Sequence, residues 1–219
     1  MGRPHLVICD LDGTLVDSFG DIRRSIITAL AAIDVTPTDE LLDWVRKGIS
    51  LELYFEKATG NARSSEPDRL KTFVDTYRDS YFTADFASEA YESVPDTLAF
   101  VRKQYPQLRV AVATTKRTDM ARVVVDRCGL DEFFDLVQGS DNIRKKPNPD
   151  LLQLVAEKLD VPVTGAMMLG DTDKDVLAAK AAGCVSVAVT YGGWTRAEML
   201  TLDPDHLVDD FSELRQLLQ

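Results

Sequence analysis

Apolar residues along this chain gather in short runs, separated by longer segments in which they recur with helical spacing. Most of the runs are apolar at nearly every position, which is typical of parallel strands buried on both faces. The runs that we predict to be strands occupy residues 6–9, 108–113, 136–139, 166–169 and 185–189. Although the third run is less continuous than the others, the pattern predicts a buried parallel sheet.

Helical patterns separate the later strands. Residues 117–128 and 174–182 are each followed by a glycine, which is common just beyond the end of a helix. Asn148 and Pro149 fit an N-cap and a first helical residue, and they open a predicted helix that runs to about residue 159. Strands that alternate with helices in this way predict an α/β fold with a doubly wound, Rossmann-like parallel sheet.

The first connection is far longer than the others. Roughly a hundred residues separate the first two strands, whereas connections in α/β units usually have only a few. Ser18 to Asp21 fit a capping box, Ser-x-x-Asp, ahead of apolar residues with helical spacing over 22–33. Further helices are predicted at residues 41–47, 51–59, 67–82 and 86–90.

These helices have apolar faces of their own, which is the pattern of a small separate domain. We therefore expect an α/β core of residues 1–16 and 91–219 and an inserted helical domain of residues 17–90. A helix that begins near Pro95 is expected to return the chain to the sheet.

The composition is that of an ordinary globular protein with an acidic surface. The chain has 219 residues, of which 45% are hydrophobic and 28% charged, and its formal net charge is −11. Because this charge repels nucleic acid and anionic membranes, we expect neither as a partner. A small anionic substrate would need a local positive site. No pattern in the sequence predicts an oligomeric state.

The sequence favours the cytoplasm. It has no run of about 18 apolar residues, which a membrane span needs, and its N-terminal residues lead into the first strand without the pattern of a signal peptide. Cys9, Cys128 and Cys184 lie in or beside apolar segments without metal-binding spacing. We expect buried free thiols in a reducing compartment.

The first strand ends in the segment Asp10-Leu11-Asp12-Gly13-Thr14. Residues two apart in an extended chain point the same way, so Asp10 and Asp12 are expected to face the crevice where α/β sheets bind ligands. Such close carboxylates need a cation or a shared proton, and one could act as a nucleophile while the other moves protons. Gly13 would permit a sharp turn. Taken alone, the segment also fits an ordinary turn.

Polar residues follow two later strands. Thr114, Thr115 and Lys116 stand between the second strand and a helix, where a hydroxyl and backbone N–H groups suit a phosphate oxygen. Helix capping is the alternative. Lys146, beside Pro147, could offset negative charge in the site, or belong to a solvated basic turn.

The fourth strand is followed by Gly170-Asp171-Thr172-Asp173-Lys174-Asp175. Asp171 and Asp175 are four residues apart, so one helical turn brings them to the same side. Carboxylate oxygens gathered in a crevice suit Mg²⁺, whereas an acidic first helical turn is the alternative, to which we assign Asp173. All these motifs fall in order at strand ends, which independent turns would rarely produce.

As a set, the motifs resemble those of the haloacid dehalogenase superfamily of phosphohydrolases, in the branch with a helical cap inserted after the first strand. The resemblance rests on Asp10-Leu11-Asp12-Gly13-Thr14, Thr114, Lys146-Pro147, Gly170-Asp171 with Asp175, and the tail from Cys184 to Asp210. It implies a Mg²⁺-dependent phosphatase that hydrolyses a small phosphate monoester through an aspartyl-phosphate.

The resemblance also implies a role for each acidic residue. Asp10 would be the nucleophile and a Mg²⁺ ligand. Asp12 would protonate the leaving oxygen and then activate water, while its backbone carbonyl binds the metal. Asp171 would bind Mg²⁺ directly, and Asp175 would support it, directly or through water.

The remaining core residues are implied to bind the phosphoryl group. Thr114 would hydrogen-bond its oxygens, with Gly13 and Thr115 in the same site, and Lys146 would neutralise charge on it and on Asp10. Thr115 departs from the Asn that phosphoglycolate phosphatases commonly carry. Its backbone N–H still serves the phosphate, whereas the leaving-group contacts change.

Two further segments, Leu15-Val16-Asp17-Ser18 and Thr190-Tyr191-Gly192-Gly193, are most similar to phosphoglycolate phosphatases within the superfamily. The segment that begins at Arg46 resembles the substrate-specificity loop of the cap. Arg46, Lys47 and Gly48 are therefore candidate substrate contacts. Solvated charges at a helix end are the alternative.

Three competing functions fit the sequence less well. Sugar phosphomutases of this family typically carry a His soon after the first motif, and residues 19–33 contain none. A dehalogenase lacks the second acid, which is present as Asp12. A non-catalytic protein that binds a phosphorylated metabolite would have lost one or more acids, and none is missing. We therefore expect a phosphatase acting on a small phosphorylated metabolite.

Overall fold

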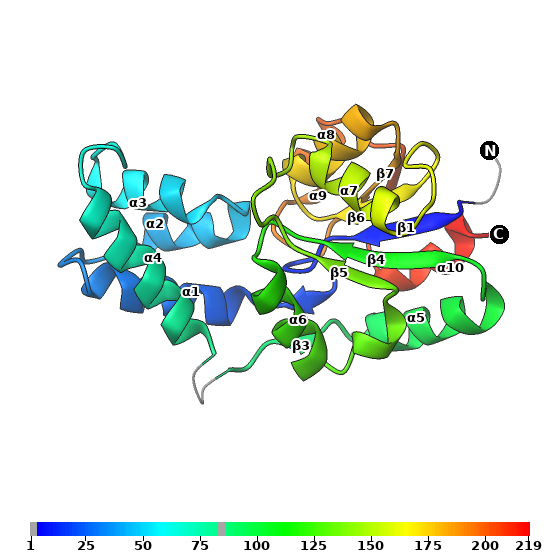
Figure 1. Ribbon diagram of the computed structural model, residues 1–219, viewed down its shortest axis with the longest axis horizontal. Helices are drawn as coiled ribbons and strands as arrows, with labels where there is room; N and C mark the ends of the chain where they lie inside the picture. Colours follow the sequence, from blue (N-terminus) through cyan, green and yellow to red (C-terminus); the bar gives the residue numbers. More distant parts are fainter. Residues whose placement is uncertain (1–3, 83–85) are drawn as a thin grey trace. The chain divides into compact units, whose positions relative to one another are not determined.

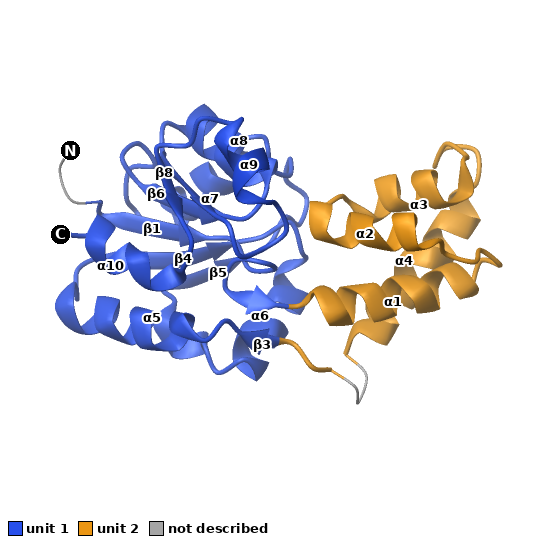
Figure 2. Ribbon diagram, turned by 180° about the vertical axis from the view of Figure 1, so that it is seen from behind, with its two compact units in different colours: residues 1–17, 89–219 blue, residues 18–88 orange. Residues whose placement is uncertain are grey.

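The computed structural model describes residues 4–82 and 86–219 (Figure 1). The chain forms two compact units (Figure 2). The core unit comprises the chain up to Asp17 together with Glu89–Gln219, and the helical unit comprises Ser18–Ser88. In the part of the chain that is described, every helix is too short or too polar to span a lipid bilayer.

A six-stranded parallel sheet forms the centre of the core unit, with the order β5-β4-β1-β6-β7-β8. Its strands are β1 (Leu6–Cys9), β4 (Arg109–Ala113), β5 (Leu136–Gln138), β6 (Met167–Gly170), β7 (Val185–Val189) and β8 (His206–Val208). The doubly wound fold predicted from the sequence is confirmed. The strand order reverses at β1, and ligands bind beyond the carboxyl ends of strands at such a switch point.

Helices cover both faces of this sheet (Figure 1). One face carries α7 (Asp150–Lys158) and α8 (Asp173–Ala182), which bury Leu6, Ile8 and Met168 against their own apolar residues. The other carries α5 (Ser93–Gln104), α6 (Thr118–Arg127) and α10 (Leu214–Leu217). The shorter elements of the core unit are η2 (Asp131–Phe133), α9 (Arg196–Leu200) and η3 (Phe211–Glu213).

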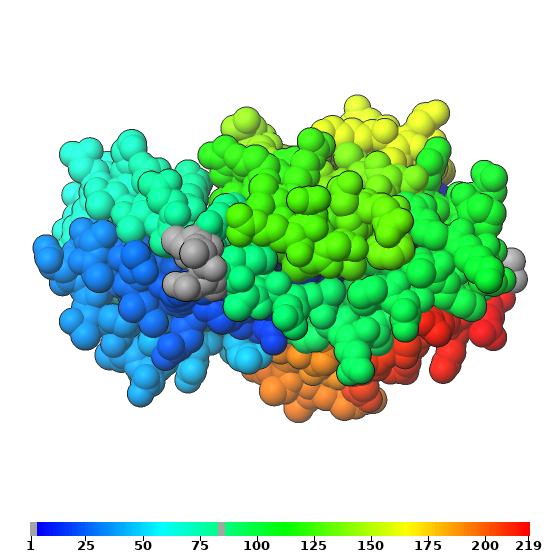
Figure 3. Space-filling model, turned by 90° about the horizontal axis from the view of Figure 1, so that it is seen from below, coloured from blue at the N-terminus to red at the C-terminus, as the bar shows by residue number. Residues whose placement is uncertain are grey.

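The C-terminal helix packs beside α5, as the red and green surfaces of Figure 3 show. The guanidinium of Arg215 lies 5.1 Å from the centroid of the Phe100 ring. A cation over an aromatic face is a favourable contact, and this one stabilises the packing of α10 against α5.

One predicted helix is wrong. Instead of a helix over residues 86–90, the structure has the strand β3 (Glu89–Ala90), which pairs antiparallel with β2 (Val16–Asp17). Tyr91 N–H also donates to Leu15 O at 3.0 Å. Backbone pairing with a segment far away in the sequence overrides the local helical pattern.

The helical unit is built from α1 (Phe19–Ala31), α2 (Asp39–Asp43), η1 (Trp44–Lys47), α3 (Leu51–Thr59) and α4 (Pro67–Tyr81). Helices α1 and α4 pack together, and the ring of Phe55 meets that of Phe73 with centroids 6.0 Å apart. Both rings are fully buried. The unit therefore has an apolar core of its own.

The capping box predicted at Ser18 and Asp21 is also wrong. The side chain of Ser18 makes no cap hydrogen bond to α1. The buried carboxylate of Asp21 instead accepts hydrogen bonds from the backbone N–H groups of Ala87 and Ser88, from the Ser88 hydroxyl and from Arg24. The returning chain offers Asp21 more donors than the end of its own helix, so Asp21 ties together the two ends of the helical unit.

Asn148 was predicted to cap α7, but the N-cap is Pro149. The backbone N–H and the side-chain amide of Asn148 both donate to Lys145 O, at 3.1 and 3.0 Å. Asn148 therefore closes the turn that contains Lys146 instead of starting the helix.

Candidate active site

The predicted core residues come together at the carboxyl edge of the sheet. Asp10 directly follows β1, and its backbone N–H donates to Leu169 O at 2.9 Å, which continues the sheet pairing. Thr114 directly follows β4, and Asp171 directly follows β6. Lys146 lies in the loop that follows β5. Parallel strands bring their carboxyl ends to one edge, which explains why distant motifs meet.

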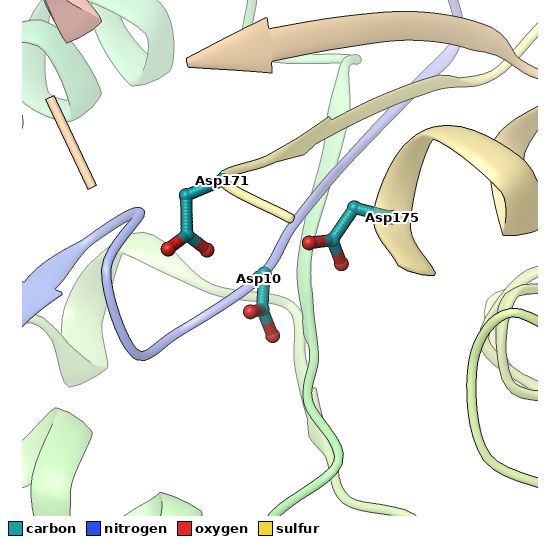
Figure 4. Close-up of side chains that lie close together, drawn as sticks. All are labelled: Asp10, Asp171 and Asp175. Carbon is teal, nitrogen blue, oxygen red and sulfur yellow. The ribbon is translucent and has the colours of Figure 1, made fainter. Parts of the chain in front are cut away.

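Asp10, Asp171 and Asp175 form a cluster of acids (Figure 4). Each offers a carboxylate oxygen within 4.8 Å of the others. Lys146 Nζ donates to Asp10 Oδ1 at 2.9 Å, to Asp175 Oδ1 at 2.6 Å and to Ala113 O at 2.8 Å. Two of the three carboxylates thus contact the buried ammonium group of Lys146, and the cluster holds more carboxylates than ammonium groups.

The electrostatics of the cluster favour a further cation. Burial raises the pKa of Asp10 to about 7, although the charge of Lys146 works against it. Burial, and then the charges of Asp10 and Asp175, raise the pKa of Asp171 well above its usual range. Hard carboxylate oxygens that repel one another fit a divalent cation such as Mg²⁺. The donor set is thus suited to a metal. Of the predicted metal ligands, Asp10, Asp171 and Asp175 have their carboxylates in this cluster.

Asp171 is held from two sides. Its Oδ1 accepts a hydrogen bond from Thr14 Oγ1 at 3.2 Å, and its Oδ2 accepts one from Gly193 N–H at 2.7 Å. The hydroxyl of Tyr191 donates to Thr14 O at 2.8 Å. A β-carbon on Gly192 would lie only 2.2 Å from Gly13 O, so only glycine fits there. The segment 191–193 therefore clamps the turn after β1 against Asp171.

Asp175 combines the two roles that the sequence left as alternatives. Its Oδ2 accepts hydrogen bonds from Thr172 N–H at 3.1 Å and Thr172 Oγ1 at 2.7 Å, as a capping residue of α8 does. Its Oδ1 faces Lys146 in the acidic cluster. Gly170 makes room, because a β-carbon there would lie 2.1 Å from Asp175 Cβ. A helix cap thus fixes the orientation of a site carboxylate.

Thr114 and Thr115 lie in the loop between β4 and α6. Thr114 is buried, and its N–H donates to Gln138 O at 3.1 Å. Thr115 is half-buried, and its carbonyl accepts from Ser140 Oγ at 2.7 Å. Both residues stand at the sheet edge that carries the acids, and their part in binding phosphate stays a prediction.

The side chain of Asp12 does not belong to the cluster of Asp10, Asp171 and Asp175. Its Oδ2 lies 3.1 Å from the Nζ of Lys116, a residue to which sequence reasoning assigned no role of its own. The two residues are 104 positions apart by their numbers, and only the strand-end placement of both motifs pointed to their meeting. Gly13 has a φ of 83°, which suits glycine, and turns the chain after Asp12 as predicted.

Arg46, Lys47 and Gly48 are placed within the helical unit. Arg46 and Lys47 lie in the last turn of η1, which ends at Gly48 in the left-handed conformation with a φ of 57°. The Arg46 guanidinium lies 4.5 Å from the centroid of the Phe19 ring. Arg46 is exposed, and its part in substrate binding stays a prediction.

Comparisons with known proteins agree with this arrangement. Residues 7–189 match the family described as haloacid dehalogenase-like hydrolase. A protein named "Probable phosphatase IndB" from Dickeya dadantii is 35% identical over 95% of this chain and 91% of its own length. A phosphoglycolate phosphatase from Pectobacterium atrosepticum is 33% identical over 95% of this chain and 90% of its own.

A solved structure shows the same fold. The haloacid dehalogenase-like hydrolase SP0104 from Streptococcus pneumoniae superposes with a TM-score of 0.86 at 25% identity, and the match covers 100% of both chains. The chain therefore belongs to the haloacid dehalogenase-like hydrolase family. Within that family it is a phosphatase, a hydrolase of phosphoric monoesters.

Proposed function

We propose that the protein is a Mg²⁺-dependent phosphatase that hydrolyses a small phosphate monoester through an aspartyl-phosphate on Asp10. The observation that carries the proposal is the position of Asp10. Its carboxylate follows the central strand β1, accepts a hydrogen bond from Lys146 and lies in one cluster with Asp171 and Asp175. A nucleophile at a topological switch point, beside fixed positive charge, suits attack on a phosphate.

The chain's own residues divide the reaction between them. An oxygen of Asp10 forms a bond to phosphorus while the bond from phosphorus to the leaving oxygen breaks, and Asp12 gives that oxygen its proton. Water then attacks the phosphorus of the aspartyl-phosphate and passes a proton to Asp12, while the bond from phosphorus to the Asp10 oxygen breaks. Inorganic phosphate leaves, and both acids are regenerated. Lys146 offsets the negative charge that gathers on Asp10 and the phosphoryl oxygens.

Residues of the loops after β1 and β4 are assigned to the phosphoryl oxygens. The hydroxyl of Thr114 and the backbone N–H of Thr115 are the donors assigned to these oxygens, beside the turn at Gly13, because the N–H groups of Gly13 and Thr114 already donate to Val16 O and Gln138 O. Positioning and charge neutralisation account for most of phosphoryl-transfer catalysis, so a rigid loop is an advantage.

Asp10, Asp171 and Asp175, with the backbone carbonyl of Asp12, would hold Mg²⁺. When bound, the cation supplies charge that lets an anionic nucleophile approach an anionic phosphate. The excess of carboxylates over ammonium groups in the cluster supports this assignment.

We assign the substrate to small metabolites such as phosphoglycolate or a sugar phosphate, in the cytoplasm. The name of the Pectobacterium atrosepticum relative, a phosphoglycolate phosphatase, supports the first. Arg46, Lys47 and Gly48 of the helical unit are the proposed leaving-group contacts. The net charge of −11 disfavours polyanionic substrates.

The test is a screen of small phosphate esters with purified enzyme. Hydrolysis should require Mg²⁺, stop in EDTA and return with Mg²⁺. Ca²⁺ should restore it poorly, because its larger and more flexible ligand shell misplaces the phosphoryl group. Full activity in EDTA after exhaustive dialysis would overturn the metal assignment, and preference for phosphoproteins over every small ester would overturn the substrate class.

A further inference from the structure

Lys116 makes an ion pair with Asp12 that is largely shielded from water. Lys116 Nζ lies 3.1 Å from Asp12 Oδ2, and the two side chains are 7% and 20% exposed. Opposite charges interact more strongly at such a place than on the open surface, where water screens them. The contact is therefore suited to fixing the direction of the Asp12 carboxyl group.

The backbone of Lys116 is itself held in place. Its N–H donates to Thr114 Oγ1 at 3.2 Å, and its carbonyl accepts from Ser140 N–H at 3.0 Å. The hydroxyl of Ser140 also donates to Thr115 O at 2.7 Å. The loop after β4 is thus bound to the loop after β5 at Thr115 and at Lys116.

Gly139 makes this approach possible. A β-carbon at Gly139 would lie 2.4 Å from Lys116 O, closer than any real contact allows. Because hydrogen bonds join the two loops, the Lys116 side chain starts from a fixed backbone position, from which its ammonium group reaches Asp12. Preorganised charge of this kind is what a catalytic site requires.

We propose that Lys116 is the positioning residue for proton transfer by Asp12. It holds Oδ2 of the carboxyl group, and the proton is exchanged with the leaving oxygen, and later with water, at Oδ1. Lys116 itself neither gains nor loses a proton in either step. This inference rests on the proposed function, in which Asp12 is the general acid and base.

This role predicts that the loss of kcat/KM on removing Lys116 depends on the leaving group of the substrate. Phenolate is a more basic leaving group than p-nitrophenolate, so phenyl phosphate depends more on a proton donor. The ratio kcat/KM reports the steps up to cleavage of the ester bond. Loss of a positioned acid should therefore affect phenyl phosphate more than p-nitrophenyl phosphate, and neither ester carries a second anion that Lys116 could bind.

The experiment compares Lys116→Met, Lys116→Arg and the wild type on both esters with saturating Mg²⁺. General acid–base catalysis contributes about 10²–10⁴-fold, and we expect Lys116→Met to lower kcat/KM for phenyl phosphate about tenfold more than for p-nitrophenyl phosphate. Lys116→Arg should recover most of the difference, because it restores a cation. Lys103→Met, which removes an exposed charge on α5, should change neither value.

Other outcomes overturn the inference. An equal loss on both esters would assign Lys116 to phosphate binding or to structure, and no loss would remove it from the reaction. Thermal unfolding checks that each variant is folded, and Lys116→Gln provides the same comparison if Lys116→Met does not fold. If the wild type hydrolyses neither ester with Mg²⁺, the proposed function fails and the inference with it.

Discussion

Gly192 and Asp171 lie so close together that a β-carbon on Gly192 would come within 2.4 Å of Asp171 Cβ. The same β-carbon would lie 2.2 Å from Gly13 O. Gly192 therefore permits the contact between the turn after β1 and a proposed metal ligand. The acidic cluster depends on this glycine even though it offers no side chain to a ligand.

Gly192→Ala should weaken Mg²⁺ binding. The added methyl must displace Asp171 or the turn at Gly13, and loss of a partner that orients a ligand typically costs about 10–100-fold in metal affinity. The measurement is the Mg²⁺ concentration at half-maximal activity, together with the rise in Tm on adding Mg²⁺. Gly20→Ala is the matched control, because a β-carbon there has nothing within 4 Å. Unchanged Mg²⁺ binding in Gly192→Ala would contradict the proposal that Gly192 keeps Asp171 in position to bind the metal.

Asp21→Asn should destabilise the helical unit. Burial alone would raise the pKa of Asp21, but hydrogen bonds from Ser88, Arg24 and Ala87 outweigh it and lower the pKa below its usual value. Loss of charge-assisted hydrogen bonds from a buried group costs about 1–3 kcal/mol in the free energy of unfolding at pH 7.

The pH dependence of this effect has a definite sign. A carboxyl with a lowered folded pKa stabilises the protein above its unfolded pKa of about 3.9, and the contribution disappears as pH falls through the folded value. The difference between wild type and Asp21→Asn should therefore shrink below about pH 4.

Urea unfolding in a Trp194→Phe background isolates the helical unit, because Trp44 then reports on it alone. Asp79→Asn, at an exposed position of α4, is the control and should change stability little. A difference between wild type and Asp21→Asn that stays constant down to pH 3 would contradict the assigned role.

Arg46→Ala and Lys47→Ala should raise KM for phosphoglycolate more than for p-nitrophenyl phosphate. Only phosphoglycolate offers a carboxylate, so removal of a positive contact affects its binding selectively. Lys57→Ala is a suitable control, since Lys57 is another exposed cation of the helical unit and lies 3.6 Å from the centroid of the Trp44 ring. An equal response of both substrates would show that this segment does not recognise the leaving group.

The sequence predicted the sheet and the strand-end residues well for a physical reason. Buried parallel strands are continuous apolar runs, and their carboxyl ends must meet at one edge. The sequence alone therefore places Asp10, Lys146 and Asp171 at one edge of the sheet. Their contacts follow from topology and require no knowledge of side-chain packing.

The errors and omissions have a different origin. Asp21 fits a local capping pattern, but its partners Ala87 and Ser88 lie far along the chain. Gly192 and Lys116 likewise act through contacts with residues remote in sequence. Periodicity and local motifs contain no information about such pairs. The helix predicted at residues 86–90 is wrong for the same reason, because β3 pairs with the distant strand β2.

The measurement that tests the central claim most directly is hydrolysis of p-nitrophenyl phosphate by Asp10→Asn with saturating Mg²⁺. An amide cannot replace the carboxylate as a nucleophile, so the account predicts a folded protein whose turnover is lower by several orders of magnitude. Far-UV circular dichroism and Tm establish that it is folded. A folded Asp10→Asn variant that keeps about a tenth of the wild-type rate would contradict the account.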